Sequence, residues 1–192
     1  MHTHNFPYHI ILASKSPRRQ DLLKGLGFEF EIRTKEVEEH YPSHLKREDV
    51  ALFLSELKAD AFKNELSNNE ILITSDTIVC IDDEILGKPE GEKGAIKMLQ
   101  QLSGKKHEVI TAVTLCSAQK KKSFFVTTAV YFKVLTNREI EYYVANFQPY
   151  DKAGSYGIQE WIGYIGIEKI EGSYFNVMGL PTHQLYEQLL NF

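Results

Sequence analysis

Apolar and polar positions follow two different periods along the first third of the chain. Residues 9–13 form a short apolar run, and residues 28–33 alternate apolar and charged positions, so both segments are typical of strands. Between them, Ser16 and Pro17 stand where a helix N-cap and first helical residue are expected, and leucines spaced for one helix face follow up to a nearby glycine. The order strand, polar turn, helix points backbone N–H groups at an anion.

The same periods continue to the end of the chain and favour an α/β fold. In the middle of the chain they predict a polar loop over 34–46, a helix over 47–64, an apolar strand over 71–81 and a helix over 92–102. A strand hairpin over 107–116 and 123–134 follows, with a basic turn at 119–122. The last elements are a helix from the Thr136–Glu139 capping box to Ala145, a glycine- and aromatic-rich stretch over 150–172, and a helix over 181–190. Helices alternate with strands first, and two strands pair later. We therefore expect a mixed sheet within one domain over residues 1–192.

Composition narrows the class of protein. The chain has 192 residues, 43% of them hydrophobic, and a formal net charge of −4, which argues against a broad basic face for nucleic acid. No apolar stretch is long enough to span a bilayer, and the start does not read as a signal peptide, so we expect a cytoplasmic protein. Cys80 and Cys116 are expected to be buried thiols, and His2 and His4 to belong to a mobile end without a metal site.

Cations gather at the predicted start of the first helix. Ser14, Ser16, Arg18 and Arg19 stand in this turn, where positive side chains oppose the helix dipole unless an anion binds. Arginine forks grip phosphate oxygens. The turn is therefore either a phosphate site or a solvated first turn with surface arginines.

Two charged residues fall where a core is expected. Lys58 lies within the apolar arc of the 47–64 helix, so it either snorkels to the edge or meets an anion. Asp76 interrupts the apolar strand 71–81, where an ionised carboxylate is costly unless a cation or hydrogen bonds compensate it. Asp76 is therefore a metal or catalytic candidate, or else a structural hydrogen-bond hub.

Two loops add weaker candidates. Lys88 lies between Gly87 and Pro89, which fix a turn, although an exposed turn lysine is the more common case. Residues 151–159 contain two glycines and end in Gln159, an amide that can read a nucleobase edge, although the segment alone is more often a plain glycine-rich loop.

Together these residues match what phosphoryl transfer on a nucleotide demands. Several cations can hold phosphate oxygens, and Asp76 with Glu38 or Glu39 can supply carboxylate oxygens. Such ligands suit Mg²⁺ or Mn²⁺.

The chain resembles the Maf family of nucleoside triphosphate pyrophosphatases over nearly its whole length. The matching segments run in family order: 12–23, 37–39, 57–59, 75–79, 86–89, 102–104 with His107, Val109 and Thr111, then 151–159 and 170–181. The resemblance implies an elongated α/β fold, similar to inosine triphosphate pyrophosphatases, with a mixed sheet and a cleft between two lobes. It also implies cleavage of a nucleoside triphosphate to the monophosphate and diphosphate, with a divalent metal, and a homodimer.

The family pattern assigns roles to particular residues. Asp76 corresponds to the proton-accepting, metal-associated acid and Glu39 to a second acid near the metal, while the phosphate-binding cations correspond to Arg18, Arg19, Lys58 and Lys88. Arg18, Thr77 and Gln159 resemble the subgroup that acts on dTTP and UTP rather than 7-methyl-GTP. We therefore expect Ser14, Ser16, Arg18, Arg19, Lys58, Thr77, Lys88 and Gln159 to bind substrate.

The chain departs from the family pattern at two places. Glu160 and Trp161 follow Gln159, where the family often has a glycine, and Ser75 replaces a common Ala or Gly. The first departure bears on the shape of the base pocket.

Other functions are separable by experiment. A nucleotide-binding regulator of cell division without turnover, or a 7-methyl-GTP pyrophosphatase, is compatible with the same motifs. An aspartyl-phosphate phosphatase is disfavoured, since it needs an acid two residues before a second acid, and Thr74 stands there.

Overall fold

The elements of the chain follow the predicted order, and residues 6–192 are the part that this computed structural model describes. The strands are β1 His9–Leu12, β2 Phe30–Ile32, β3 Glu70–Ile81, β4 Glu84–Leu86, β5 Lys106–Cys116, β6 Lys121–Phe132 and β7 Ile167–Glu171. The helices are α1 Pro17–Gly25, α2 Glu48–Asp60, α3 Gly91–Leu102, α4 Asn137–Phe147, α5 Trp161–Gly166, α6 Tyr174–Val177 and α7 Thr182–Leu190, with a 3₁₀ turn, η2, at Ala153–Ser155. His2 and His4 lie outside the described residues.

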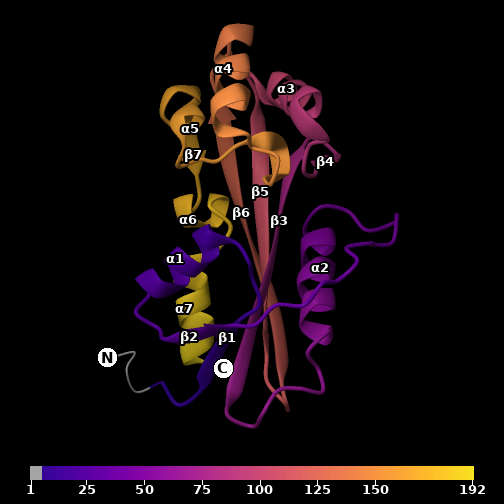
Figure 1. Ribbon diagram of the computed structural model, residues 1–192, viewed down its shortest axis with the longest axis vertical. Coiled ribbons are helices and arrows are strands. Elements are labelled where there is room, and N and C mark those ends of the chain that lie inside the picture. The colour runs from indigo at the N-terminus through magenta and orange to yellow at the C-terminus, as the bar shows by residue number, and fades with distance from the viewer. Residues whose placement is uncertain (1–5) are drawn as a thin grey trace. The chain divides into compact units, whose positions relative to one another are not determined.

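Within these residues seven strands form one mixed sheet (Figure 1). The order is β2-β1-β3-β5-β6-β7, and β4 pairs with β3 off this path. β1 is parallel to both β2 and β3, while β4 is antiparallel to β3 and β7 is antiparallel to β6. β5 and β6 are neighbours joined by a short turn over 117–120, where the hairpin is predicted. The expected mixed α/β sheet is thereby confirmed.

Besides the 3₁₀ turn η2, the structure adds two strands and two helices that the patterns do not predict: β4, α5, β7 and α6. β4 is three residues long and returns from β3 through Asp82, whose φ is 51°. α5 and β7 occupy the stretch 150–172, where apolar, glycine and charged positions follow no single period. These elements are three to six residues long, too short to show a hydrophobic period of their own.

The chain divides into two compact units. The first comprises residues up to Asp76, Thr111–Val126 and Gly179–Phe192, and the second comprises Thr77–Ile110 and Thr127–Met178. The prediction of one domain over residues 1–192 stays a prediction.

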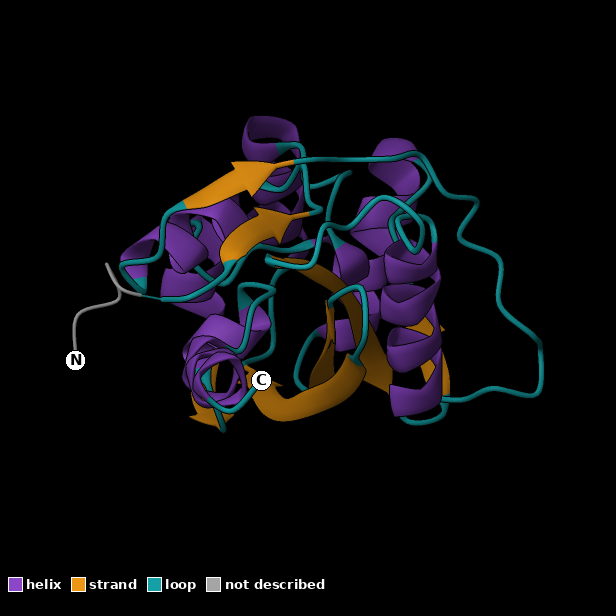
Figure 2. Ribbon diagram, turned by 90° about the horizontal axis from the view of Figure 1, so that it is seen from below, coloured by secondary structure: helices purple, strands orange, loops and turns teal. Residues whose placement is uncertain are grey.

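In the first unit, alternate strand residues face different helices. Ile10, Leu12, Ile71 and Ile73 belong to the cluster that contains the leucines of α1 and α7, whereas the intervening Ile11 and Leu72 pack with Ala59 and Phe62 at α2. Figures 1 and 2 show helices on both sides of these strands. The period of two therefore sends Ile71 and Ile73 at the start of β3 toward α1 and α7, and Leu72 between them toward α2.

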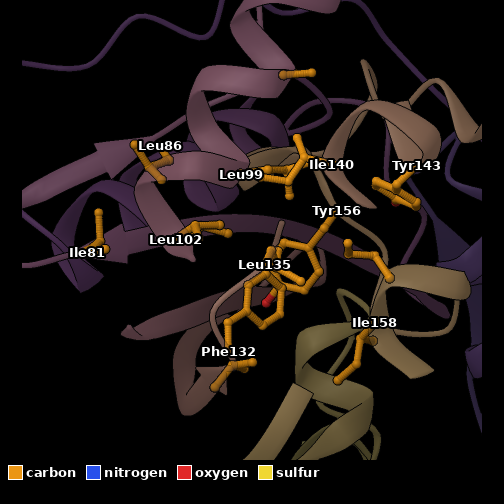
Figure 3. Packing of buried hydrophobic residues seen from close by; sticks show 14 of the residues in the cluster. Ile81, Leu86, Leu99, Leu102, Phe132, Leu135, Ile140, Tyr143, Tyr156 and Ile158 are labelled. Carbon is orange, nitrogen blue, oxygen red and sulfur yellow. The ribbon is translucent and has the colours of Figure 1, made fainter. Parts of the chain in front are cut away.

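The second unit has its own core, shown in Figure 3. It joins Val79 and Ile81 of β3 to one face each of α3 and α4, including Leu99 and Ile140, and to Tyr156 from the glycine-rich stretch. The predicted capping box starts α4: the Thr136 side chain accepts from the Glu139 N–H, and the Glu139 carboxylate accepts from Thr136.

Two expectations about the chain as a whole can be compared with these elements. Cys80 and Cys116 are buried free thiols, as predicted. Among the residues that the structure describes, none of the helices has both the length and the apolar character to cross a bilayer.

Candidate active site

The turn before α1 has the shape of an anion site. Ser16 is the N-cap residue and Pro17 begins the helix, as predicted, but the Ser16 side chain makes no capping hydrogen bond. Instead Ser14 Oγ accepts from the Ser16 N–H at 3.2 Å, and Gln20 donates to the Ser14 carbonyl at 3.1 Å. The first turn of α1 contains no acidic residue. Its backbone N–H groups are thus presented without competing negative charge.

Arg19 joins three segments of the first unit. Its Nε donates to the Gly179 carbonyl at 2.8 Å, and one terminal nitrogen donates to the Ser75 carbonyl at 2.9 Å. Burial lowers the pKa of Arg19, the charges of Asp76 and Glu39 oppose that effect, and the neighbouring charge of Arg18 adds to it. Arg19 therefore fixes the backbone beside Asp76, a positioning contribution that the sequence did not predict.

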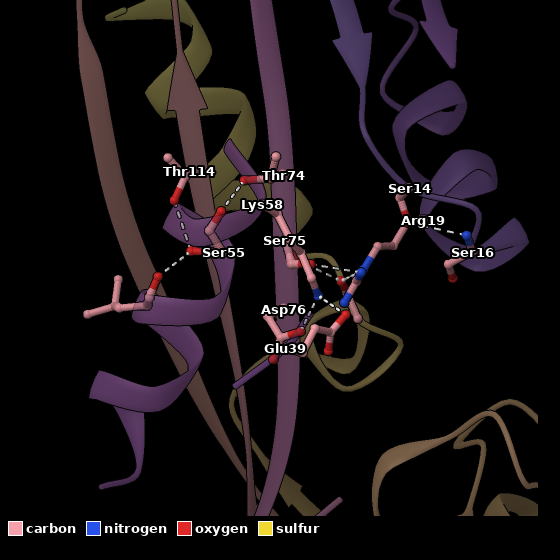
Figure 4. A network of polar contacts seen from close by, with 12 residues as sticks. Ser14, Ser16, Arg19, Glu39, Ser55, Lys58, Thr74, Ser75, Asp76 and Thr114 are labelled. Carbon is pink, nitrogen blue, oxygen red and sulfur yellow. Dashed lines mark hydrogen bonds and ion pairs between the residues drawn. The ribbon is translucent and has the colours of Figure 1, made fainter. Parts of the chain in front are cut away.

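Lys58 meets two carboxylates (Figure 4). Its Nζ lies 2.6 Å from Asp76 Oδ1 and 3.0 Å from Glu39 Oε1. The exposed fractions of the side chains are 18% for Lys58, 11% for Asp76 and 46% for Glu39. Of the two alternatives for Lys58, snorkelling and pairing with an anion, the structure has the second, and of the two candidate acids it brings Glu39 to this lysine.

The local fold explains this meeting. Asp76 lies on the same face of β3 as Leu72 and Thr74, because the three residues are two positions apart. The Thr74 hydroxyl donates to the Ser55 carbonyl of α2 at 2.6 Å. These even positions of β3 face α2, so Asp76 lies on the side where the last turn of the helix carries Lys58. Glu39 arrives from the polar loop between β2 and α2.

The two carboxylates fit a magnesium-like cation. Asp76 and Glu39 already converge on one positive group, the Lys58 ammonium, within 3.0 Å. Among residues 6–192 there is no cluster of three or more His, Cys, Asp or Glu side chains that suits a metal. Mg²⁺ commonly uses one or two carboxylates together with water and substrate phosphates, so two oxygen donors are sufficient.

Three predicted substrate-binding residues belong to the second unit. Thr77 follows Asp76 in β3 and is partly buried. Lys88 is exposed in the turn after β4, and the carbonyl of its neighbour Gly87 accepts from the Gly154 N–H at 3.1 Å. The lysine turn and the glycine-rich stretch that leads to Gln159 are thus bonded to each other.

Gln159 carries an acceptor with nothing bound to it. Its Oε1 is buried and accepts no hydrogen bond from any residue in the described range 6–192. A buried amide oxygen without a donor is costly, and native structures rarely leave one unexplained. Gln159 therefore offers an acceptor to an incoming donor, which is how an amide reads a base edge.

The structure thus brings some of the predicted site residues together within the first unit, while the others belong to the second unit. Ser14 and Ser16 share the α1 turn, and Arg19, Lys58, Glu39 and Asp76 form one charged cluster in the first unit, with Arg18 close enough to act on Arg19. Thr77, Lys88 and Gln159 belong to the second unit. Sequence reasoning missed Tyr143 and Lys152, which contact Glu160, the residue after Gln159, and the only available signal was the glutamate itself.

Comparison with known proteins places the chain among relatives. A family model described as "Maf-like protein" matches residues 9–192. A dTTP/UTP pyrophosphatase from Christiangramia forsetii is 55% identical over 182 residues, covering 95% of this chain and 93% of the relative. One from Bacteroides thetaiotaomicron is 51% identical over 183 residues, with 95% of each chain covered. The structure of the Staphylococcus aureus Ham1 protein matches 94% of this chain and 99% of its own, with a TM-score of 0.50 and 16% identity, which indicates a shared fold.

Proposed function

The chain belongs to the Maf-like protein family, and from that premise we propose that it hydrolyses dTTP and UTP to the monophosphate and diphosphate. The observation that carries the proposal is the meeting of Lys58, Asp76 and Glu39 in a charged cluster with Arg19. Relatives that are 46–55% identical over nearly their whole length are named dTTP/UTP pyrophosphatase. The reaction makes the protein a hydrolase of acid anhydrides.

Phosphate binding is the task of the α1 turn and the cations. The Ser16 hydroxyl is not used for capping, and the Ser14 hydroxyl can still donate while its oxygen accepts from Ser16. Both can bind phosphate oxygens together with the first-turn N–H groups. Arg18 adds a guanidinium, and Arg19 keeps this turn next to Ser75 and hence to Asp76.

Proton transfer from the attacking water is assigned to Asp76. The ammonium of Lys58 holds this carboxylate at 2.6 Å and compensates its charge within a largely buried place. A carboxylate fixed in this way can accept a proton from water directed at the α-phosphorus. Asp76 and Glu39 are the residues that would hold Mg²⁺ or Mn²⁺, which when bound neutralises developing charge on the phosphate oxygens.

Base recognition is assigned to Gln159. Thymine and uracil present an N3–H donor, whereas cytosine presents an acceptor at that position. The unpartnered Oε1 of Gln159 matches the donor, and a buried acceptor facing another acceptor is penalised. Thr77 and Lys88 are proposed to contact the nucleotide as well, Lys88 through the diphosphate leaving group.

A nucleotide panel tests the proposal. The protein is incubated with dTTP, UTP, CTP and 7-methyl-GTP in the presence of Mg²⁺, and pyrophosphate release is measured. We expect dTTP and UTP to be preferred. Asp76→Asn should keep the fold by circular dichroism and lose about 10³-fold or more in kcat. Turnover of dTTP by this variant at the parent rate would refute the catalytic assignment.

The same panel separates the rival functions. Tight binding of dTTP without pyrophosphate release favours a regulator, and preference for 7-methyl-GTP favours the other subgroup. We also propose that the protein is a cytoplasmic homodimer that does not bind nucleic acid. Light scattering tests the dimer, and titration with fluorescently labelled DNA tests the absence of nucleic-acid binding.

A further inference from the structure

Glu160, the residue after Gln159, has its carboxylate bound on both sides within the second unit. Tyr143 of α4 donates its phenolic hydrogen to Glu160 Oε2, and Lys152 Nζ lies 3.2 Å from Glu160 Oε1. The Tyr143 oxygen also accepts the backbone N–H of Gly157 at 3.0 Å. Glu160 thereby connects α4 and Lys152 to the segment that carries Gln159.

The packing leaves this segment little freedom. A Cβ placed on Gly157 would lie 2.6 Å from Cδ of Glu160, so the Gly157 backbone rests directly against the carboxylate. Gly154 and Ser155 both have positive φ, 67° and 61°, a conformation that a serine adopts only with tertiary support. The segment is held by the network rather than by its own backbone preferences.

The charges in the network are compensated. Lys152 is 9% exposed and also contacts Asp151 at 2.8 Å, so its ammonium lies between two carboxylates. Burial, and then the hydrogen bond to Glu160, raise the pKa of Tyr143, which keeps its phenol protonated as the donor. Removing Glu160 would leave a buried cation and a buried hydroxyl each without one partner, and the segment would rearrange to recover them.

We propose that Glu160 is a positioning residue for nucleobase selection: through Tyr143 and Lys152 it fixes the backbone that aims Gln159 Oε1 at the N3–H of thymine or uracil. This inference rests on the proposed function. It also explains the departure from the family pattern after Gln159, because the glutamate replaces a glycine with a side chain that holds the segment from its C-terminal end. In this proposal Glu160 contacts neither the reacting atoms nor the base, and it acts on base selectivity through the position of Gln159.

The test compares Glu160→Ala, Glu160→Gln and Tyr143→Phe with the control Glu141→Gln, an exposed glutamate of α4. For Glu160→Ala we expect the KM for dTTP and UTP to rise about tenfold, the effect of losing one well-aimed hydrogen bond, with kcat changed less than twofold. The KM for CTP should change little, so selectivity falls by the same factor. Glu160→Gln should keep part of the selectivity, because its amide oxygen can still accept the hydrogen bond from Tyr143.

Two results would overturn the inference. One is unchanged selectivity between dTTP and CTP in Glu160→Ala and Tyr143→Phe. The other is an equal fall in kcat/KM for every nucleotide, which would indicate a purely structural role for Glu160. Tyr143→Phe combined with Glu160→Ala should be far from additive, because both remove the same network. Should Glu160→Ala fail to fold, Glu160→Gln and Tyr143→Phe still decide the question.

Calorimetry with the α,β-methylene analogues of dTTP and CTP separates this inference from the proposed function. If the parent binds the dTTP analogue but releases no pyrophosphate from dTTP, the hydrolase proposal fails. The positioning inference is then decided by whether Glu160→Ala lowers the ratio of the two affinities about tenfold. A parent that binds neither analogue overturns both.

Discussion

Lys58→Met is the perturbation that tests the charged cluster most directly. The ammonium lies 2.6 Å from Asp76 and 3.0 Å from Glu39, and methionine keeps most of the side-chain volume without the charge. Asp76, with 11% of its side chain exposed, would then be a largely buried carboxylate without its cation. Glu39, at 46% exposure, can return to water at little cost.

The magnitude follows from that difference in burial. Losing a hydrogen bond to a charged group costs about 1.5–3 kcal/mol, and breaking a fully buried ion pair costs about 3–5 kcal/mol. The partial exposure of Lys58 places the expected loss of unfolding free energy in the lower range, about 1.5–3 kcal/mol. Because Lys58 is also predicted to bind the substrate phosphates and holds the proposed proton acceptor Asp76, kcat/KM should fall about 10²–10³-fold.

Urea denaturation and pyrophosphate release from dTTP measure the two effects. Lys63→Met, at an exposed position just after α2, is the matched control and should change neither. Lys58→Met combined with Asp76→Asn should lose less stability than the sum of the single variants, by about 1–3 kcal/mol, since the second change removes the uncompensated charge. Parent-like stability and activity in Lys58→Met would refute the reasoning.

Three further predictions concern other parts of the molecule. Arg19→Lys replaces the two separate nitrogens that donate to the carbonyls of Ser75 and Gly179 with a single ammonium in a different position. Urea denaturation should therefore show a loss of about 1–2 kcal/mol in unfolding free energy, and an unchanged midpoint contradicts this prediction. Burial lowers the pKa of His107 in the folded protein to about 4. As the pH falls below 6.5, the imidazole is therefore protonated in the unfolded chain before it is protonated in the folded protein. Stability should therefore decline between pH 6.5 and 4 by up to about 3 kcal/mol more in the parent than in His107→Gln. Parallel pH profiles of the two proteins would argue against this. Chelation with EDTA should abolish turnover, and Mg²⁺ or Mn²⁺ should restore it better than Zn²⁺; activity that survives EDTA excludes the metal proposal.

Local patterns predicted the long elements well and the short ones poorly. β3, β5, β6, α3 and α4 have periods that extend over many residues, and the capping box at Thr136 was found from four letters of sequence. β4 pairs with the end of β3 just before it, but at three residues it is too short to show a hydrophobic period. β7 pairs with β6, which lies far from it in the sequence, so its pairing energy comes from a partner that a local window does not contain.

The candidate site was predicted as a set of residues but not as a set of contacts. Lys58 and Asp76 stood out because a charge inside an apolar period is costly, and the structure pairs them with each other. The exposed loop that brings Glu39 has no period, so the sequence left Glu38 and Glu39 as alternatives. Glu160 stood out only as a departure from the family pattern. Its contacts with Tyr143 of α4 and with Lys152 before η2 were missed because neither residue is its neighbour along the chain.

The sequence by itself determined the positions of the long strands and helices, which residues are out of place in a core, and which family the chain resembles, because these depend on order and spacing along the chain. Only the tertiary structure decided that Lys58 joins Asp76 to Glu39 and that Arg19 binds two backbone carbonyls. It also decided that the buried side-chain oxygen of Gln159 has no donor among residues 6–192. The physical reason is that charge compensation and hydrogen bonding act over a few ångströms in space. Their strength depends on burial, and neither distance nor burial is a property of any short stretch of sequence.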